Sequence, residues 1–323
     1  MISVEGLTKC YGDIVAVDNV SFQIEEGHVY GLLGPNGAGK TTIMNIMTGC
    51  LSATEGSVRI YGHDIFEEAN EAKRLIGYLP EQPPLYMTDT PLEYLKFVGE
   101  AKGLRGAKLK GQIDEVIHKT KIGHVKGRPI SSLSKGYKQR VGIAQALLGN
   151  PKVIILDEPT VGLDPIQIVE IRDLIKELGR SHTVIFSSHI LSEVQAICDQ
   201  VLIISKGKLI AFDEPKNLEK LLLAPNEILI TTDAREKEIK DILADMDHIV
   251  DMDIEEGDYT VAHIKIDHED IYEVSRQIFF GFAHKGKALV EMSLKKTDLE
   301  DIFIELTGGS ESQEATEREE VKQ

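Results

Sequence analysis

The chain has 323 residues, 42% of them hydrophobic, which is enough to form one large domain with a smaller one. Its longest apolar runs, such as Val153 to Leu156 and Val201 to Ile204, are far shorter than the roughly 20 residues that span a bilayer. Most of the formal charge of −17 lies after Pro225, which disfavours nucleic acid or anionic lipid as a direct partner of that region.

The N-terminal segment and the cysteines give no indication of export, disulfides or metal binding. The segment from Met1 to Glu5 lacks the basic stretch and apolar core of a secretory signal, so we expect a cytoplasmic protein. Cys10, Cys50 and Cys198 are too widely spaced for a disulfide framework or a zinc site. We therefore expect reduced cysteines and no structural metal.

The first strong pattern is a strand followed directly by a glycine-rich loop and a helix. After an alternating strand at Asn19 to Ile24, the run Val29 to Leu33 reads as a buried strand. From Thr41 to about Leu51, apolar residues recur at helical spacing. The loop between them is Gly34-Pro35-Asn36-Gly37-Ala38-Gly39-Lys40-Thr41, which matches the P-loop pattern in the context that this pattern requires.

The P-loop pattern predicts a nucleotide site because each of its parts suits phosphate. The glycines let backbone N–H groups face the phosphates, and the helix N-terminus adds its dipole. Lys40 would contact the β and γ oxygens, and the Thr41 hydroxyl would ligate Mg²⁺. The alternative, a simple glycine-rich turn, is disfavoured by the strand-to-helix context. We predict ATP and Mg²⁺ as ligands, with a nucleotide-binding set of Gly34, Asn36, Gly37, Ala38, Gly39, Lys40, Thr41 and Thr42.

The middle of the chain predicts an inserted helical subdomain within an α/β fold. Residues from about 91 to 148 show helical patterns and no convincing strand. Short β-branched runs then resume at Val153 to Leu156, Thr183 to Ser187 and Val201 to Ile204, with helical patterns between them. This alternation is typical of a largely parallel sheet that carries helices on both faces.

Charged side chains end two of these strands. Asp157 and Glu158 follow the buried run from Val153, and carboxylates in that position need a charged partner such as Mg²⁺. We predict that Asp157 holds the metal and that Glu158 is the general base for the attacking water; a helix or turn cap is the alternative. His189 closes the next strand and is predicted to contact the γ-phosphate or the attacking water.

After Pro225 the pattern changes to a strand, helix, strand, strand, helix, strand order. This order predicts a small α+β domain of ferredoxin-like fold over residues 226–307. Its last helix would begin at Thr297, and the glutamate-rich segment 308–323 reads as a disordered acidic tail.

Read in order, the motifs resemble the complete series of ATP-binding-cassette ATPases. They are Tyr11, the P-loop, Leu133-Ser134-Lys135-Gly136-Tyr137, Asp157-Glu158, Gly162-Leu163-Asp164 and His189, and they cover about residues 1–222. The resemblance implies a RecA-like P-loop NTPase core with the helical insertion. It also implies that Tyr11 stacks on adenine, and that Ser134 and Gly136 contact the nucleotide of a second, head-to-tail cassette, in a dimer expected to be a homodimer. The residue-level alternative for Tyr11 is a half-buried strand residue.

The chain departs from the family pattern at two places. The family signature usually ends Gly-Gly-Gln, but here Lys135 and Tyr137 accompany the serine and glycine of that signature, and the Q-loop position falls on Glu81 or Gln82. Glu81 would be a third candidate ligand of Mg²⁺, and which of the two residues takes the coupling role stays open.

The resemblance implies a function in membrane transport. It predicts an ATP-hydrolysing subunit at the inner face of the cell membrane, paired with separate permease chains, with export favoured over uptake. Residues from Pro80 to Phe97, including Tyr86 and Tyr94, are candidates for the docking groove. The alternatives are a soluble cassette ATPase that remodels ribosomes or DNA, and a P-loop kinase or switch GTPase, which would leave the signature segment unexplained.

Overall fold

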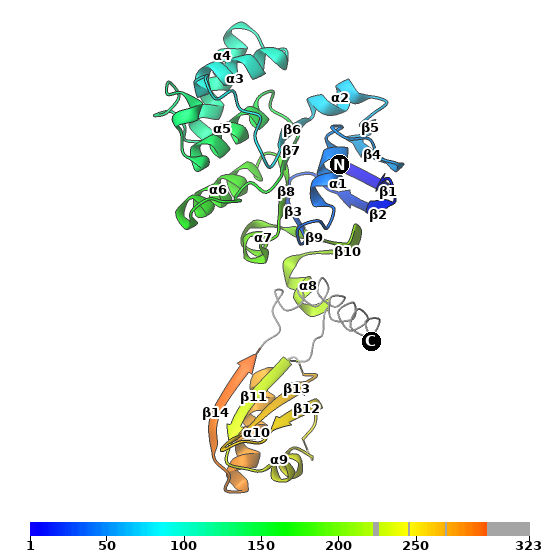
Figure 1. Cartoon of the computed structure of the whole chain (residues 1–323), viewed down its shortest axis with the longest axis vertical. Coiled ribbons are helices and arrows are strands. Elements are labelled where there is room, and N and C mark those ends of the chain that lie inside the picture. The colour runs from blue at the N-terminus through cyan, green and yellow to red at the C-terminus, as the bar shows by residue number, and fades with distance from the viewer. Residues whose placement is uncertain (222–225, 245, 269, 296–323) are drawn as a thin grey trace, which may run out of the picture. The chain divides into compact units, whose positions relative to one another are not determined.

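The computed structural model describes residues 1–221, 226–244, 246–268 and 270–295, so the helix expected from Thr297 and the acidic tail lie outside the described residues. The chain divides into two compact units, Met1–Pro215 and Lys216–Gln323, which we treat separately. Figure 1 gives the labels of the helices and strands. Within the described ranges, no helix is both long and apolar enough to cross a membrane.

A six-stranded sheet forms the centre of the first unit. Its order is β10-β9-β3-β8-β7-β6, and the strands from β9 to β6 are parallel, while β10 is antiparallel to β9. All residues of β3, β7 and β8 are buried, as expected for strands covered on both faces. The strands are β3 (Val29–Leu33), β6 (Ile76–Leu79), β7 (Val153–Leu156), β8 (Thr183–Ser188), β9 (Gln200–Ser205) and β10 (Lys208–Asp213).

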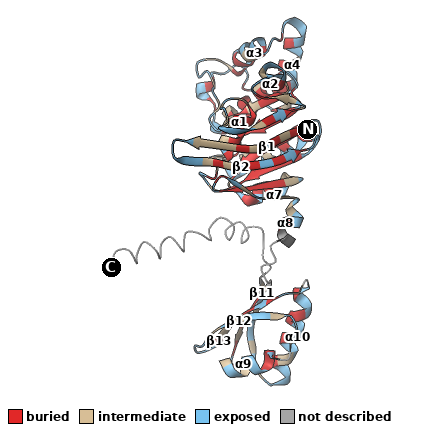
Figure 2. Cartoon of the chain, turned by 90° about the vertical axis from the view of Figure 1, so that its right-hand side faces the viewer, coloured by how far each residue is buried: buried red, intermediate tan, exposed pale blue. Residues whose placement is uncertain are grey.

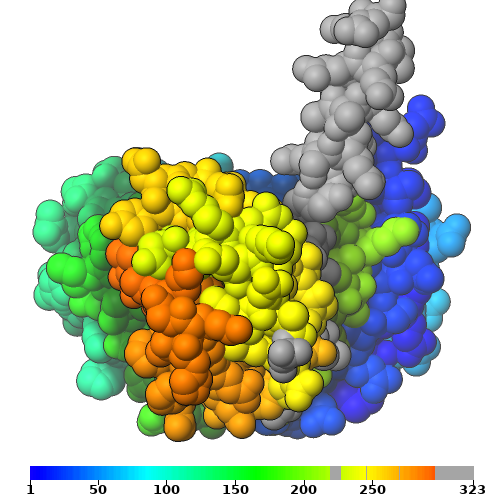
Figure 3. All heavy atoms as spheres, turned by 90° about the horizontal axis from the view of Figure 1, so that it is seen from below, coloured from blue at the N-terminus to red at the C-terminus, as the bar shows by residue number. Residues whose placement is uncertain are grey.

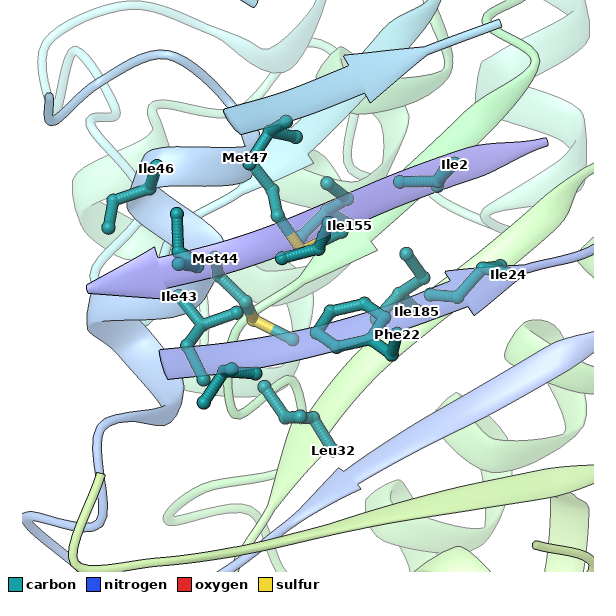
Figure 4. Close-up of a cluster of buried hydrophobic side chains, with 14 of the residues drawn as sticks. Ile2, Phe22, Ile24, Leu32, Ile43, Met44, Ile46, Met47, Ile155 and Ile185 are labelled. Atoms are coloured by element: carbon teal, nitrogen blue, oxygen red, sulfur yellow. The ribbon is translucent and has the colours of Figure 1, made fainter. Parts of the chain in front are cut away.

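A second, antiparallel sheet was predicted from the sequence only in part. Its strand order is β2-β1-β4-β5. Helix α1 (Lys40–Met47) packs against this sheet, and residues of the six-stranded sheet belong to the same hydrophobic core (Figure 4). In that core Met44 of α1 meets Phe22 of β2 and Leu32 of β3, among others. The P-loop helix is thus held by both sheets. The strands are β1 (Ile2–Tyr11), β2 (Ile14–Ile24), β4 (Glu55–Ile60) and β5 (His63–Asp64).

The region from 91 to 147 consists of helices joined by turns, without a strand, and the sequence pattern indicates the same. Thr90 caps α3 in a capping box with Glu93: the Thr90 hydroxyl accepts from Glu93 N–H at 3.3 Å, and Thr90 N–H donates to the Glu93 carboxylate at 2.9 Å. The remaining helices of the unit are α2 (Ala69–Arg74), α3 (Pro91–Ala101), α4 (Gly106–Lys119), the 3₁₀ turn η1 (Ile130–Ser132), α5 (Lys135–Leu147), α6 (Pro165–Leu178) and α7 (Leu191–Ile197). A short helix α8 (Pro215–Leu221) follows β10.

One helix is shorter than expected. The periodic pattern predicts a helix from Thr41 to about Leu51, but α1 ends at Met47. Gly49 has a φ of +66°, a conformation that ends a helix and that glycine adopts without strain. Apolar periodicity continues past this break because Leu51 packs against the same core.

The second unit has the predicted order of strands and helices. It consists of β11 (Asn226–Thr232), α9 (Glu236–Leu243), β12 (Ile249–Glu255), β13 (Thr260–Ile266), α10 (Ile271–His284) and β14 (Leu289–Lys295). The strands form an antiparallel sheet of order β12-β13-β11-β14. Both helices bury their apolar sides against the sheet in a core that includes Ile230, Ile264 and Phe282. Figure 2 shows this burial in red, and Figure 3 shows one face of the unit in yellow to orange.

Candidate functional site

The loops that carry the predicted site leave the carboxyl ends of neighbouring parallel strands. The P-loop follows β3, the Pro80–Gln82 segment follows β6, Asp157 and Glu158 follow β7, and His189 follows β8. Because these strands run in the same direction side by side, their ends meet at one edge of the sheet, where open α/β folds bind ligands.

A cavity of about 410 Å³ opens at this edge. It brings together ten of the residues predicted from the sequence, and it also includes Ala16 of β2 and Val161, which the sequence did not indicate. The predicted residues that line the cavity are Asn36, Gly37, Ala38, Gly39, Lys40, Thr41, Thr42, Glu81, Glu158 and His189. Gln82 is not in this lining, so the structure places Glu81 rather than Gln82 at the cavity.

The loop after β3 is shaped by glycines in conformations that other residues rarely adopt. Gly37 and Gly39 have φ values of +81° and +106°. A Cβ at Gly39 would lie only 2.6 Å from the Ala16 carbonyl oxygen, and one at Gly34 would collide with the Ile204 carbonyl. Helix α1 begins at Lys40 without a side-chain cap, so its first N–H groups face the cavity as donors for an anion.

Lys40, Glu158 and His189 form a continuous chain of polar contacts across the cavity. The buried Lys40 ammonium lies 3.3 Å from Glu158 Oε1 and donates to the carbonyls of Gly34 and Pro35 at 2.7 and 3.2 Å. Glu158 Oε2 lies 2.9 Å from Nδ1 of His189. The Lys40 ammonium is thus held by oxygens that a phosphate group can replace.

Glu158 is fixed by its backbone as well as by its side chain. Its φ is +46°, an unusual value for a residue with a side chain, and such strain is typical of functional sites. Its N–H donates to Ser187 Oγ at 2.8 Å, and Ser187 Oγ donates to Asp157 Oδ1 at 2.6 Å. The two neighbouring carboxylates therefore have different partners, Ser187 for Asp157 and the pair Lys40 and His189 for Glu158.

Asp157 is fully buried next to the cavity, and its surroundings fit a divalent cation. No donor among the described residues reaches its Oδ2. Burial raises the pKa of this carboxyl above its usual value, and the hydroxyls of Ser187 and Thr41 offset this only in part. A buried carboxylate oxygen without a donor, close to a threonine hydroxyl, matches the oxygen ligands that Mg²⁺ prefers.

Five of the predicted residues are not in the cavity lining: Gly34 and Asp157, described above, and Tyr11, Ser134 and Gly136. Tyr11 lies at the end of β1, 49% exposed, with the Lys9 ammonium over its ring. The Ser134 hydroxyl caps α5 by accepting from Tyr137 N–H at 3.4 Å. Gly136 is buried against Gln167, whose Oε1 would lie 2.5 Å from an added Cβ. That Ser134 and Gly136 lie outside the cavity fits the expectation that they contact the nucleotide of a second subunit.

The departures in the signature segment have local partners. The Tyr137 hydroxyl lies 3.0 Å from Nε2 of His124, and the two rings meet edge to face. Lys135 lies against Gly162, where a side chain would collide with its ammonium group. Asp164, two residues after Gly162, caps α6 by accepting a 2.9 Å hydrogen bond from Gln167 N–H. The signature segment is therefore packed on the loop that follows Glu158.

Comparison with known proteins agrees with these features. A family model described as ABC transporter matches residues 17–161. The uncharacterized ABC transporter ATP-binding protein YxlF of Bacillus subtilis (strain 168) is 34% identical over 312 residues, covering 95% of this chain and 99% of YxlF. The bacitracin transport ATP-binding protein BcrA of Bacillus licheniformis is 35% identical over 319 residues, covering 96% and 98%. The dimeric structure of MJ0796, a bacterial ABC transporter cassette, matches with a TM-score of 0.61 and 29% identity, over 66% of this chain and 98% of that one.

Proposed function

The chain belongs to the ABC transporter family of ATP-binding proteins, and on that premise we propose that it binds and hydrolyses ATP to power export through separate permease chains. The observation that carries the proposal is the convergence of Lys40, Glu158 and His189 on a cavity beside the P-loop. The match to BcrA along nearly its whole length supports a transporter of the same class. The chain would then act at the inner face of the membrane, bound to its permease.

The residues around the cavity suggest how hydrolysis proceeds. ATP phosphates would be bound by the N–H groups at the start of α1 and by Lys40, which would exchange Glu158 and the loop carbonyls for phosphate oxygens. Glu158, freed from Lys40, would accept a proton from the attacking water, while His189 orients that carboxylate and contacts the γ-phosphate. Because phosphoryl transfer depends on positioning and charge, these contacts account for most of the chemistry.

Thr41, Asp157 and Glu81 are the residues that would hold Mg²⁺. The bound ion would neutralise charge that develops on the phosphate oxygens. In the chain itself, Ser187 fixes the orientation of Asp157 through the 2.6 Å hydrogen bond, so that its other oxygen is left for a ligand.

Asp157→Asn tests this assignment through stability as well as activity. Since the pKa of Asp157 is raised in the folded chain, its ionised form disfavours folding at every pH above its unfolded pKa. Removing that charge should raise the melting temperature of the nucleotide-free chain by about 2–4 °C, equivalent to about 1 kcal/mol. The same variant should lose Mg²⁺-dependent ATP turnover. Calorimetry and ATPase assays with Asp173→Asn, an exposed acid of α6, as control would check both; lower stability or retained turnover would contradict the assignment.

We further propose that two chains enclose ATP head to tail, with Ser134 and Gly136 of each chain contacting the nucleotide of the other. Tyr11 would stack on the adenine ring, which fits its exposed position at the end of β1. The exposed aromatic cluster Tyr86 and Phe97, whose ring centroids lie 5.2 Å apart, would contact the permease. Aromatic residues of this kind are enriched at protein interfaces.

The second unit fits a ferredoxin-like fold. In its sheet the first strand along the chain, β11, pairs with the last, β14. A ferredoxin-like topology requires this pairing. It has its own core of residues from β11 to β14. We propose that it is an accessory domain, outside the ATP site.

ATP turnover as a function of protein concentration tests the proposed function. If two chains form the active species, the Mg²⁺-ATPase rate per chain should rise with concentration. Ser134→Arg should bind ATP with an affinity close to that of the wild type yet lose most of its turnover, because the bulky cation would lie between the subunits. Ser181→Arg, in the turn before β8 at the opposite edge of the sheet, is the matched control. Absence of hydrolysis in the wild type would refute the ATPase, and an active Ser134→Arg would refute the dimer.

A further inference from the structure

Glu193 is a buried acid close to the proposed site, and the mechanism above does not use it. It lies in the first turn of α7 and is only 3% exposed. Its Oε2 accepts two hydrogen bonds, from Thr160 Oγ1 at 2.7 Å and from Ser188 Oγ at 2.9 Å. Both hydroxyl groups are themselves buried.

The two hydroxyls belong to the loops that carry the proposed catalytic groups. Thr160 stands two residues after Glu158, and Ser188 stands immediately before His189. Ser188 Oγ also accepts from Ile190 N–H at 3.0 Å, so it is fixed from both sides. One carboxylate oxygen therefore joins the loop after β7, which carries Glu158, to the end of β8, which precedes His189.

The second carboxylate oxygen of Glu193 lowers the stability of the folded chain. Oε1 is buried, and no donor among the described residues reaches it. A buried polar atom without a partner destabilises a fold, and an acid that served only the helix N-terminus could remain in solvent instead. The cost indicates that the contacts made by Oε2 serve a purpose other than stability.

We propose that Glu193 is a positioning residue for ATP hydrolysis, which holds Glu158 and His189 in register by tying Thr160 to Ser188. The inference rests on the proposed function. If either loop moves, the contact between the base and the histidine changes, and so does the place of the attacking water. Displacements of about 1 Å at such a site can cost up to about a hundredfold in rate.

The test compares Glu193→Ala and Glu193→Gln in the full chain. We expect Glu193→Ala to lower kcat for ATP between about tenfold and a hundredfold, with KM for ATP changed less than about threefold. Glu193→Gln should recover much of the loss, because the amide oxygen can still accept from both hydroxyls. Glu71→Gln, which changes a first-turn acid in the short exposed helix α2, is the matched control and should behave as wild type.

Thr160→Val and Ser188→Ala keep the test decisive if Glu193→Ala folds poorly, since each removes only one hydroxyl. Each should lower kcat severalfold, and combining Thr160→Val with Glu193→Gln should cost less than the product of the two single effects. Melting temperatures measured in parallel separate positioning from folding. If the variants lose only stability, or if KM rises while kcat stays unchanged, the inference is wrong and the proposed function stands. Absence of ATP turnover in the wild type would overturn both.

Discussion

Glu158→Gln should bind ATP about as tightly as the wild-type chain and hydrolyse it on the order of a thousandfold more slowly. The amide cannot accept the proton of the attacking water, but it has nearly the size of the carboxylate. It also cannot form an ion pair with Lys40, so that the ammonium is more available for phosphate. In the presence of ATP and Mg²⁺ a stable dimer of this variant should then accumulate, which light scattering or gel filtration would detect.

The same experiment with Glu67→Gln, an exposed acid before α2, serves as control and should show normal turnover without a trapped dimer. A Glu158→Gln chain that hydrolyses ATP normally would remove Glu158 from the role of base. A chain that is inactive yet stays monomeric would leave that role intact, and would show that the permease is needed to bring two cassettes together.

Most of the residues that line the candidate site could be predicted from the sequence, because they lie in short local patterns. A glycine-rich loop between a buried strand and a helix, and two carboxylates at the end of another buried strand, are both contained in short segments. Parallel strands must bring such segments to one edge, so Lys40, Glu158 and His189 could be placed together in advance.

The antiparallel sheet was predicted only in part. The alternating strand expected at Asn19 to Ile24 lies within β2, but the other strands of the sheet lack so clear an alternation. In β1, Ile2 and Val4 alternate with polar residues, but register shifts follow between Val4 and Leu7 and again before Cys10. β4 has only two buried apolar residues, Val58 and Ile60. Irregular strands of this kind are recognised only when the partner strand is in place.

The network around Glu193 depends on tertiary contacts alone. A glutamate in the first turn of a helix is an ordinary feature, and Thr160 lies 33 residues away along the chain. The ion pair of Lys40 with Glu158 is similar, since the sequence predicted phosphate as the partner of Lys40 and the attacking water as the partner of Glu158, but not that the two residues contact each other. Polar contacts between residues far apart in the sequence form only in the tertiary structure, and the hydrophobic periodicity of the sequence does not predict them.

Lys40→Met should weaken ATP binding and also destabilise the nucleotide-free chain. The side chain of Glu158 is only 9% exposed, so that loss of the ammonium leaves a buried carboxylate with His189 as its remaining partner. We expect a loss of about 2–3 kcal/mol in the free energy of unfolding, below the full cost of a broken buried pair because His189 remains. ATP affinity should fall roughly 10- to 100-fold, because a charged hydrogen-bond donor to phosphate is lost.

The double variant Lys40→Met with Glu158→Gln separates these two effects. Neutralising Glu158 removes the unpaired buried charge, so the free energy of unfolding should return close to that of the wild type, while ATP affinity stays low. Denaturant unfolding and nucleotide titration would measure the two quantities. Lys152→Met is the control, since that exposed lysine lies 4.0 Å from Glu26 and neither residue belongs to the cavity lining. If the double variant were as unstable as Lys40→Met, the lysine would stabilise the P-loop through the carbonyls of Gly34 and Pro35 rather than by compensating Glu158.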